Sequence, residues 1–103
     1  MPEYIRPNKV TSPRKSWSLI EVLDDKGEGA PALALGRWEG NPVVGIRWNG
    51  RSEEGKTLGN PQSRALSTWF ILPSWAVWGV LRTAGLDEKK LALVRNFIEE
   101  PKI

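Results

Sequence analysis

The residues best suited to recognising another molecule lie in a polar segment, 49–64, which ends with the run Gly-Asn-Pro-Gln-Ser-Arg. Arginine, asparagine and glutamine side chains bind phosphates, carboxylates, nucleobases and peptide groups through directed hydrogen bonds. A connection this long is often functional or else mobile. We therefore predict a binding site whose polar members are joined by tryptophans as stacking or apolar surfaces. Its residues are Arg47, Asn49, Arg51, Asn60, Gln62, Arg64, Trp69 and Trp38.

Several of these residues also have a purely structural interpretation, and it stays open at this point. Asn60 and Gln62 could satisfy the hydrogen bonds of their own turn. For Arg47, a solvated or salt-bridged side chain is the simpler expectation. For Trp38, contact with the core or with a helix is expected ahead of an exposed ring.

The composition excludes several kinds of catalysis. The chain has no cysteine and no histidine, so thiol nucleophiles, thiolate metal sites and imidazole acid–base catalysis are all absent. No nucleophile elbow, dinucleotide-binding or Walker glycine pattern occurs. The carboxylates of Asp24, Asp25 and Glu28, and those of Glu53 and Glu54, fall in glycine-rich turns, where we expect them to be solvated. We therefore expect no enzyme, metal or cofactor, and keep carboxylate or lysine chemistry as a third hypothesis.

The positive charge is concentrated at the start of the chain. In residues 1–15, Arg6, Lys9, Arg14 and Lys15 outnumber Glu3 by three, which equals the net charge of +3 for the whole chain. Residues 16–103 are therefore neutral overall, which weakens the case for nucleic-acid binding because that affinity needs many cations. A basic, proline-containing arm over 1–15 could still tether nucleic acid, although a disordered tail is the simpler expectation.

Targeting and membrane signals are missing from the sequence. No apolar run approaches 18 residues, and the first residues lack the apolar stretch of a signal peptide. We expect a soluble, cytoplasmic protein that does not bind membranes.

The binding residues must be held by a β-sheet. Residues 16–25 alternate as a strand, and residues 30–48 predict a hairpin with a type I′ turn at Gly40-Asn41, because both residues tolerate positive φ. Its two faces differ in side-chain size. One carries Leu33, Leu35, Val44, Ile46 and Trp48, and we expect this tryptophan in the core. The other carries Ala32, Ala34, Gly36, Gly45 and Arg47, with Trp38 at its edge.

Three further elements complete the predicted fold. Residues 64–72 are apolar on both faces, which predicts a central strand covered on both sides. A helix is expected from Ser74, as N-cap, to Gly85, with Trp75, Trp78 and Leu81 on one face. A second helix is expected from Asp87, as N-cap, to Pro101, and its outer pair Leu93 and Phe97 could form a homodimer contact.

Together these patterns predict one α+β domain over 16–103, preceded by the basic arm. Its architecture is a small, strongly bent antiparallel sheet of about four strands, such as an SH3-like partial barrel, with two C-terminal helices. The leading functional hypothesis is a non-catalytic module that binds a protein partner through segment 49–64, because tryptophan and arginine are favoured in interface hot spots. Nucleic-acid binding through the arm and an arginine face is the second hypothesis.

Overall fold

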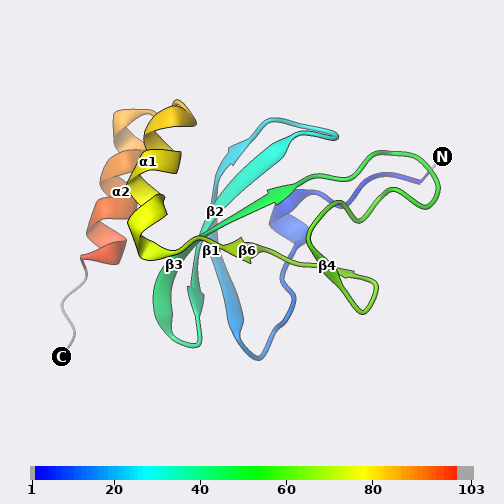
Figure 1. The fold of residues 1–103 in the computed structure, drawn as a ribbon, viewed down its shortest axis with the longest axis horizontal. Helices are drawn as coiled ribbons and strands as arrows, with labels where there is room; N and C mark the ends of the chain where they lie inside the picture. Colours follow the sequence, from blue (N-terminus) through cyan, green and yellow to red (C-terminus); the bar gives the residue numbers. More distant parts are fainter. Residues whose placement is uncertain (1, 100–103) are drawn as a thin grey trace.

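A computed structural model describes residues 2–99 as an antiparallel sheet flanked by two helices (Figure 1). The sheet has the strand order β1-β2-β3-β6, and β4 and β5 form a separate small hairpin. The elements are η1 (Pro7–Lys9), β1 (Trp17–Asp25), β2 (Pro31–Trp38), β3 (Asn41–Trp48), β4 (Gln62–Ser63), β5 (Leu66–Ser67), β6 (Phe70–Ile71), α1 (Ser74–Thr83) and α2 (Glu88–Ile98). The predicted α+β class, with a four-stranded antiparallel sheet and two C-terminal helices, is confirmed, but the described strands do not close into a barrel.

The hairpin of β2 and β3 has the predicted faces but a different tip. The turn residues are Glu39 and Gly40, with φ of 50° and 86°, and not Gly40-Asn41. Trp38 therefore pairs with Asn41, and Pro42 pairs with Arg37. The predicted tip would have placed Pro42 where the first cross-strand N–H must be donated, which proline lacks. Because the register moves by two residues, every side chain keeps its predicted face.

The bulky face of the hairpin is covered by the helices at one of its ends. Leu33, Leu35 and Val44 pack there with Val77 and Leu81 of α1 and Val94 of α2, and each of these side chains is at most 5% exposed. The N-cap prediction for α2 is confirmed, since the Asp87 carboxylate accepts a hydrogen bond from the Lys90 N–H at 2.9 Å. Gly85 follows the C-cap of α1 with φ of 78°, as predicted, but the N-cap residue of α1 is Pro73 and not the predicted Ser74.

The small-residue face is covered by two indole rings. Trp17 and Trp69 lie 6.0 Å apart between ring centroids and pack with Ala32, Ala34 and Val10. A Cβ at Gly36 would lie 2.4 Å from the Trp17 ring, and one at Gly45 would lie 3.0 Å from Trp69. The small side chains therefore leave the space that these rings occupy, since a methyl group at Gly36 would overlap one of them.

The N-terminal segment completes this second layer. Val10 is 1% exposed, and its carbonyl accepts a 2.8 Å hydrogen bond from the Trp69 indole nitrogen. The Ile5 N–H donates to the Thr57 carbonyl at 3.0 Å. The expectation of a disordered tail is therefore wrong for residues 2–15, because buried apolar side chains and two backbone contacts hold them against the sheet and the long loop.

The predicted central strand over 64–72 is wrong. The chain instead makes a tight turn at Arg64-Ala65, whose φ values are 51° and 62°, and then forms a two-residue strand, β6, at the sheet edge. The alternation assigned Trp69 and Phe70 correctly to opposite faces, but it did not show that the strand is short and lies at the sheet edge. Trp69 is buried over the small-residue face, whereas Phe70 is 57% exposed.

Two tryptophans that the sequence patterns assign to apolar faces are on the surface. Trp48 is 57% exposed and Trp75 is 86% exposed. Trp48 has the predicted face, but it lies beyond the helices, and Trp75 lies off the buried stripe that Val77 and Leu81 form. Trp17 and Leu23 lie on opposite faces of β1, because a register irregularity after Leu19 reverses the alternation between them.

The helices bear on two further predictions. Neither described helix is long and apolar enough to cross a membrane. The predicted end of the second helix, at Pro101, lies outside the described residues. Leu93 and Phe97 are partly buried against the core, and the Arg37 guanidinium lies 4.5 Å from the Phe97 ring centroid. The outer surface offered by this pair is therefore smaller than the homodimer prediction assumed.

Candidate functional site

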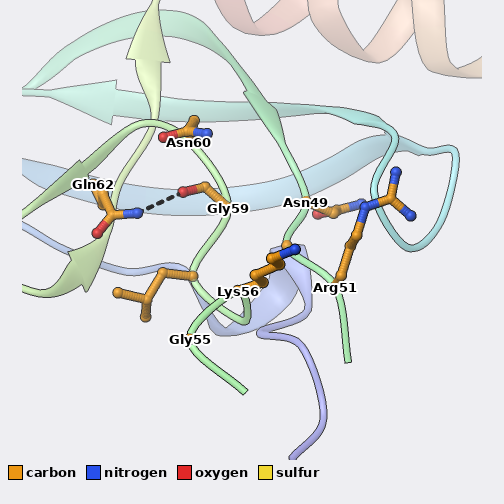
Figure 2. Close-up of a pocket in the computed structure, with 9 residues that line it drawn as sticks. Asn49, Arg51, Gly55, Lys56, Gly59, Asn60 and Gln62 are labelled. Carbon is orange, nitrogen blue, oxygen red and sulfur yellow. Dashed lines mark hydrogen bonds between the residues drawn. The ribbon is translucent and has the colours of Figure 1, made fainter. Parts of the chain in front are cut away.

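Four of the eight predicted site residues line one polar depression of about 280 Å³. They are Asn49, Arg51, Asn60 and Gln62, and Figure 2 shows Asn49 and Arg51 on one side of it with Gly59 and Gln62 opposite. The two sides come together because Asn60 pairs back onto Trp48 at the end of β3 as an isolated bridge. This bridge turns the long connection into a closed loop with a polar interior, which we call the polar pocket.

Asn49 anchors one side of the polar pocket. Its side chain is 4% exposed, and its amide nitrogen donates to the Asp25 carboxylate and the Gly27 carbonyl, both at 2.9 Å. Its Oδ1 atom is buried without a hydrogen-bond partner. A buried acceptor left in this state is costly to the folded state.

The two cations of the polar pocket, Arg51 and Lys56, are both exposed but have different surroundings. Lys56 lies 3.4 Å from the Glu53 carboxylate as an exposed ion pair, an interaction that contributes little. The Arg51 guanidinium lies so close to Gly29 that a Cβ there would meet it at 2.8 Å. Gln62 donates to the Gly59 carbonyl at 3.0 Å, so part of the alternative in which the loop satisfies its own turn is realised.

Arg47 is buried, and the expectation of a solvated or salt-bridged arginine is wrong. Its side chain is 2% exposed, and its guanidinium donates to the backbone carbonyls of Leu58, Thr68 and Pro61. Burial lowers the pKa of Arg47 to about 10, so it remains charged at neutral pH. The side chain is long enough to pass the alanine and glycine neighbours of the small-residue face, and it holds the loop and the segment before β6 to β3.

The other three predicted site residues lie elsewhere. Trp69 is buried between the sheet and the N-terminal segment. Trp38 is half-buried at the hairpin turn, at the opposite end of β2 and β3 from the polar pocket. Arg64 is exposed and lines a different depression, together with Arg14.

An apolar depression of about 480 Å³ adjoins the polar pocket, and sequence reasoning missed it. Its apolar lining residues are Pro31, Ile46, Trp48, Pro61 and Phe70, which we call the Trp48–Phe70 surface. Pro31 pairs with Trp48, and Ile46 pairs with Phe70, so the set occupies one face of the sheet. Asn60 lines both depressions and marks their common boundary.

A length argument from the sequence could have revealed this surface. Helices of 10 and 11 residues are only about 15 Å long. An eight-residue strand spans about 26 Å. Two short helices therefore leave part of a bulky face uncovered, and the part left over carries Trp48.

The remaining candidate chemistry finds no support among the described residues. No group of three or more Asp, Glu, His or Cys side chains in residues 2–99 could hold a metal ion. Asp25 and Glu28 instead accept backbone hydrogen bonds, from Gly27 and Ser52 respectively, each at 2.9 Å.

Comparisons with family models, with curated proteins and with solved structures find no match to this chain.

Proposed function

We propose that this protein is a non-catalytic binding module that holds a protein partner against the Trp48–Phe70 surface. The observation that carries the proposal is the exposure of Trp48 and Phe70, each 57% exposed, around one apolar depression. Large aromatic side chains in a pocket are the usual anchors of protein interfaces. Isolated exposed apolar residues are ordinary, but a contiguous apolar patch on a small domain indicates a binding surface.

Burying the two exposed rings would supply part of the energy that a specific interaction needs. A tryptophan or phenylalanine side chain carries up to about 200 Å² of surface, and burial yields about 25 cal/mol per Å². Covering the exposed parts of the Trp48 and Phe70 rings would contribute on the order of 5 kcal/mol. The polar pocket beside it adds hydrogen-bonding side chains, those of Asn60 and Arg51.

The lining of the two depressions favours recognition over catalysis. Among the described residues that line them there is no carboxylate and no hydroxyl, and Lys56 is the sole amine. A general acid or base needs a titratable group placed in a desolvated cleft. Lys56 is instead exposed and lies beside the Glu53 carboxylate.

Photo-crosslinking from the surface tests the proposal. A benzophenone amino acid replaces Trp48 in the full chain, which is then expressed in its native host and irradiated. The matched control carries the same group in place of Trp75, a tryptophan that is 86% exposed on α1. We expect a discrete adduct with another protein from position 48 and none from position 75.

Three results would contradict the proposal. The first is the absence of any adduct from position 48, and the second is the formation of the same adducts from both positions. The third is a nuclease-sensitive adduct, which would favour the nucleic-acid hypothesis instead. An adduct of twice the chain mass would show self-association and would replace the external partner with a second copy.

A further inference from the structure

A third depression, on another part of the molecule, brings together two arginines that are far apart in the sequence. It has a volume of about 640 Å³ and is lined by Ser12, Pro13, Arg14, Ser63, Arg64, Leu66 and Thr68. Both arginines are exposed, and no hydrogen bond or ion pair to another described residue is found for either side chain. The only charged groups in this lining are therefore two guanidinium ions. We call it the two-arginine groove.

Both walls of the groove are held in place by the fold. On one wall, the N–H groups of Ser16 and Trp17 donate to the Pro13 carbonyl at 3.1 and 2.8 Å, which fixes the turn that carries Arg14. On the other wall, Arg64 occupies the tip of the β4–β5 hairpin. The two walls are joined through the hydrogen bond from the Trp69 indole to the Val10 carbonyl. The backbone that carries the two arginines is therefore fixed before binding, which reduces the entropy lost on binding.

The turn explains the conformation of Arg64 but not the presence of an arginine there, because a two-residue hairpin of this kind requires positive φ at both tip residues. Its φ is 51°, in the left-handed region that disfavours residues with a Cβ, and Ala65 follows with φ of 62°. Glycine or asparagine satisfies such a turn at lower cost. A side chain that occupies an unfavourable backbone position and projects into a groove is a candidate for a functional role.

We propose that the two-arginine groove binds a phosphorylated serine or threonine in a peptide segment of a protein. A phosphomonoester carries close to two negative charges at neutral pH, and arginine forks donate paired hydrogen bonds to its oxygens. The hydroxyl groups of Ser12, Ser63 and Thr68 supply further donors. Leu66, which is 55% exposed, and Pro13 provide an apolar contact for a neighbouring side chain of the peptide.

The lining favours a phosphopeptide over a nucleic acid. Single-stranded nucleic acids are held by aromatic stacking and by a track of cations along the backbone. The described lining contains no aromatic ring and two cations. Two arginines match the charge of one phosphomonoester, whereas a nucleic-acid track would require more.

Fluorescence anisotropy with two matched peptide libraries tests this proposal. One library carries a fixed phosphoserine among randomised positions, and the other carries serine in its place. We expect the purified full chain to bind the phosphorylated library at least tenfold more tightly. Lowering the pH from 7.5 to 5 should weaken that binding severalfold, because the phosphomonoester gains a proton near pH 6.

The variants separate a binding role from a structural one. Arg64→Gly removes the guanidinium and relieves the left-handed strain, so the melting temperature should stay equal or rise while affinity falls at least tenfold. Arg14→Ala should lower affinity similarly. The control, Arg82→Ala, removes an exposed arginine from the last turn of α1 and should change neither quantity.

Several outcomes would overturn the proposal. They are equal binding of the two libraries, full affinity in Arg64→Gly, and no binding of the phosphorylated library at all. Binding of inorganic phosphate without any binding of peptide would also overturn it. Tighter binding of a thymidine oligonucleotide, unchanged between pH 7.5 and 5, would assign the groove to nucleic acid, since a phosphodiester does not titrate in this range.

Discussion

The two ends of the bulky sheet face belong to the same strands and follow the same alternation, yet one end is buried and the other is exposed. At the covered end, Leu35 and Val44 are 0% exposed beneath α1 and α2. At the open end, Trp48 and Phe70 are 57% exposed. Alternation along a strand assigns a side chain to a face, but the length and position of the next layer decide whether that face is buried. The covered end therefore stabilises the fold, and the open end is available to a partner.

The largest expected effect is at the covered end. Leu81 is 0% exposed and packs in the cluster between α1, α2 and the sheet. Leu81→Ala removes buried methyl groups and leaves a cavity, which should lower the free energy of unfolding by about 3 kcal/mol. Urea denaturation followed by circular dichroism measures this loss. A loss below about 1 kcal/mol would show that the covered end is not a packed core.

The next largest effect concerns the side chain that holds the loop beside the open end. Arg47→Met keeps a long side chain but leaves the carbonyls of Leu58, Thr68 and Pro61 without their donor. We expect a loss of about 2 kcal/mol in unfolding free energy and increased proteolysis within residues 49–63.

Arg82→Met is the matched control for this substitution, because Arg82 is exposed on α1. Its unfolding free energy should change by less than about 0.5 kcal/mol. If Arg47→Met were as stable as the control and equally resistant to protease, the buried guanidinium would not be what holds the loop.

The smallest expected effect concerns the hydrogen bond between Glu28 and Ser52 at the outer edge of the loop. Hydrogen bonding to Ser52 holds the pKa of Glu28 below its ordinary value of 4.5. A lowered folded-state pKa contributes stability above the unfolded value, and this contribution disappears as the pH falls through the folded value. Glu28→Gln should therefore melt slightly below the wild type at pH 7 and converge with it as the pH falls below 4.5 and through the folded-state value. A difference that grows on acidification would contradict this account.

The sequence predicted the fold to the extent that its patterns are local. The class, the two hairpin faces, the Asp87 cap and the Gly85 terminator depend on adjacent residues or on a period of two, and all are observed. The hairpin tip was placed wrongly although Pro42 alone decides it, because a prolyl nitrogen cannot donate the first cross-strand bond. The missing constraint was in the sequence.

The remaining features depend on contacts between distant segments. Arg47 is buried because three carbonyls from 58–68 converge on it, and Arg14 joins Arg64 because Trp69 reaches Val10 across 59 residues of chain. No period or spacing reports such convergence. The polar pocket was predicted in large part because its residues are contiguous in one loop, whereas the Trp48–Phe70 surface combines β2, β3, β6 and the loop.

The double variant Trp48→Ala, Phe70→Ala tests the central claim, with the partner recovered by crosslinking as the ligand. Because both side chains are more than half exposed, the unfolding free energy should fall by no more than about 2 kcal/mol. Two interface anchors at about 2 kcal/mol or more each predict an affinity loss of at least a hundredfold by titration calorimetry. An unchanged affinity, together with a stability loss as large as that of Leu81→Ala, would show that the open end belongs to the core and binds nothing.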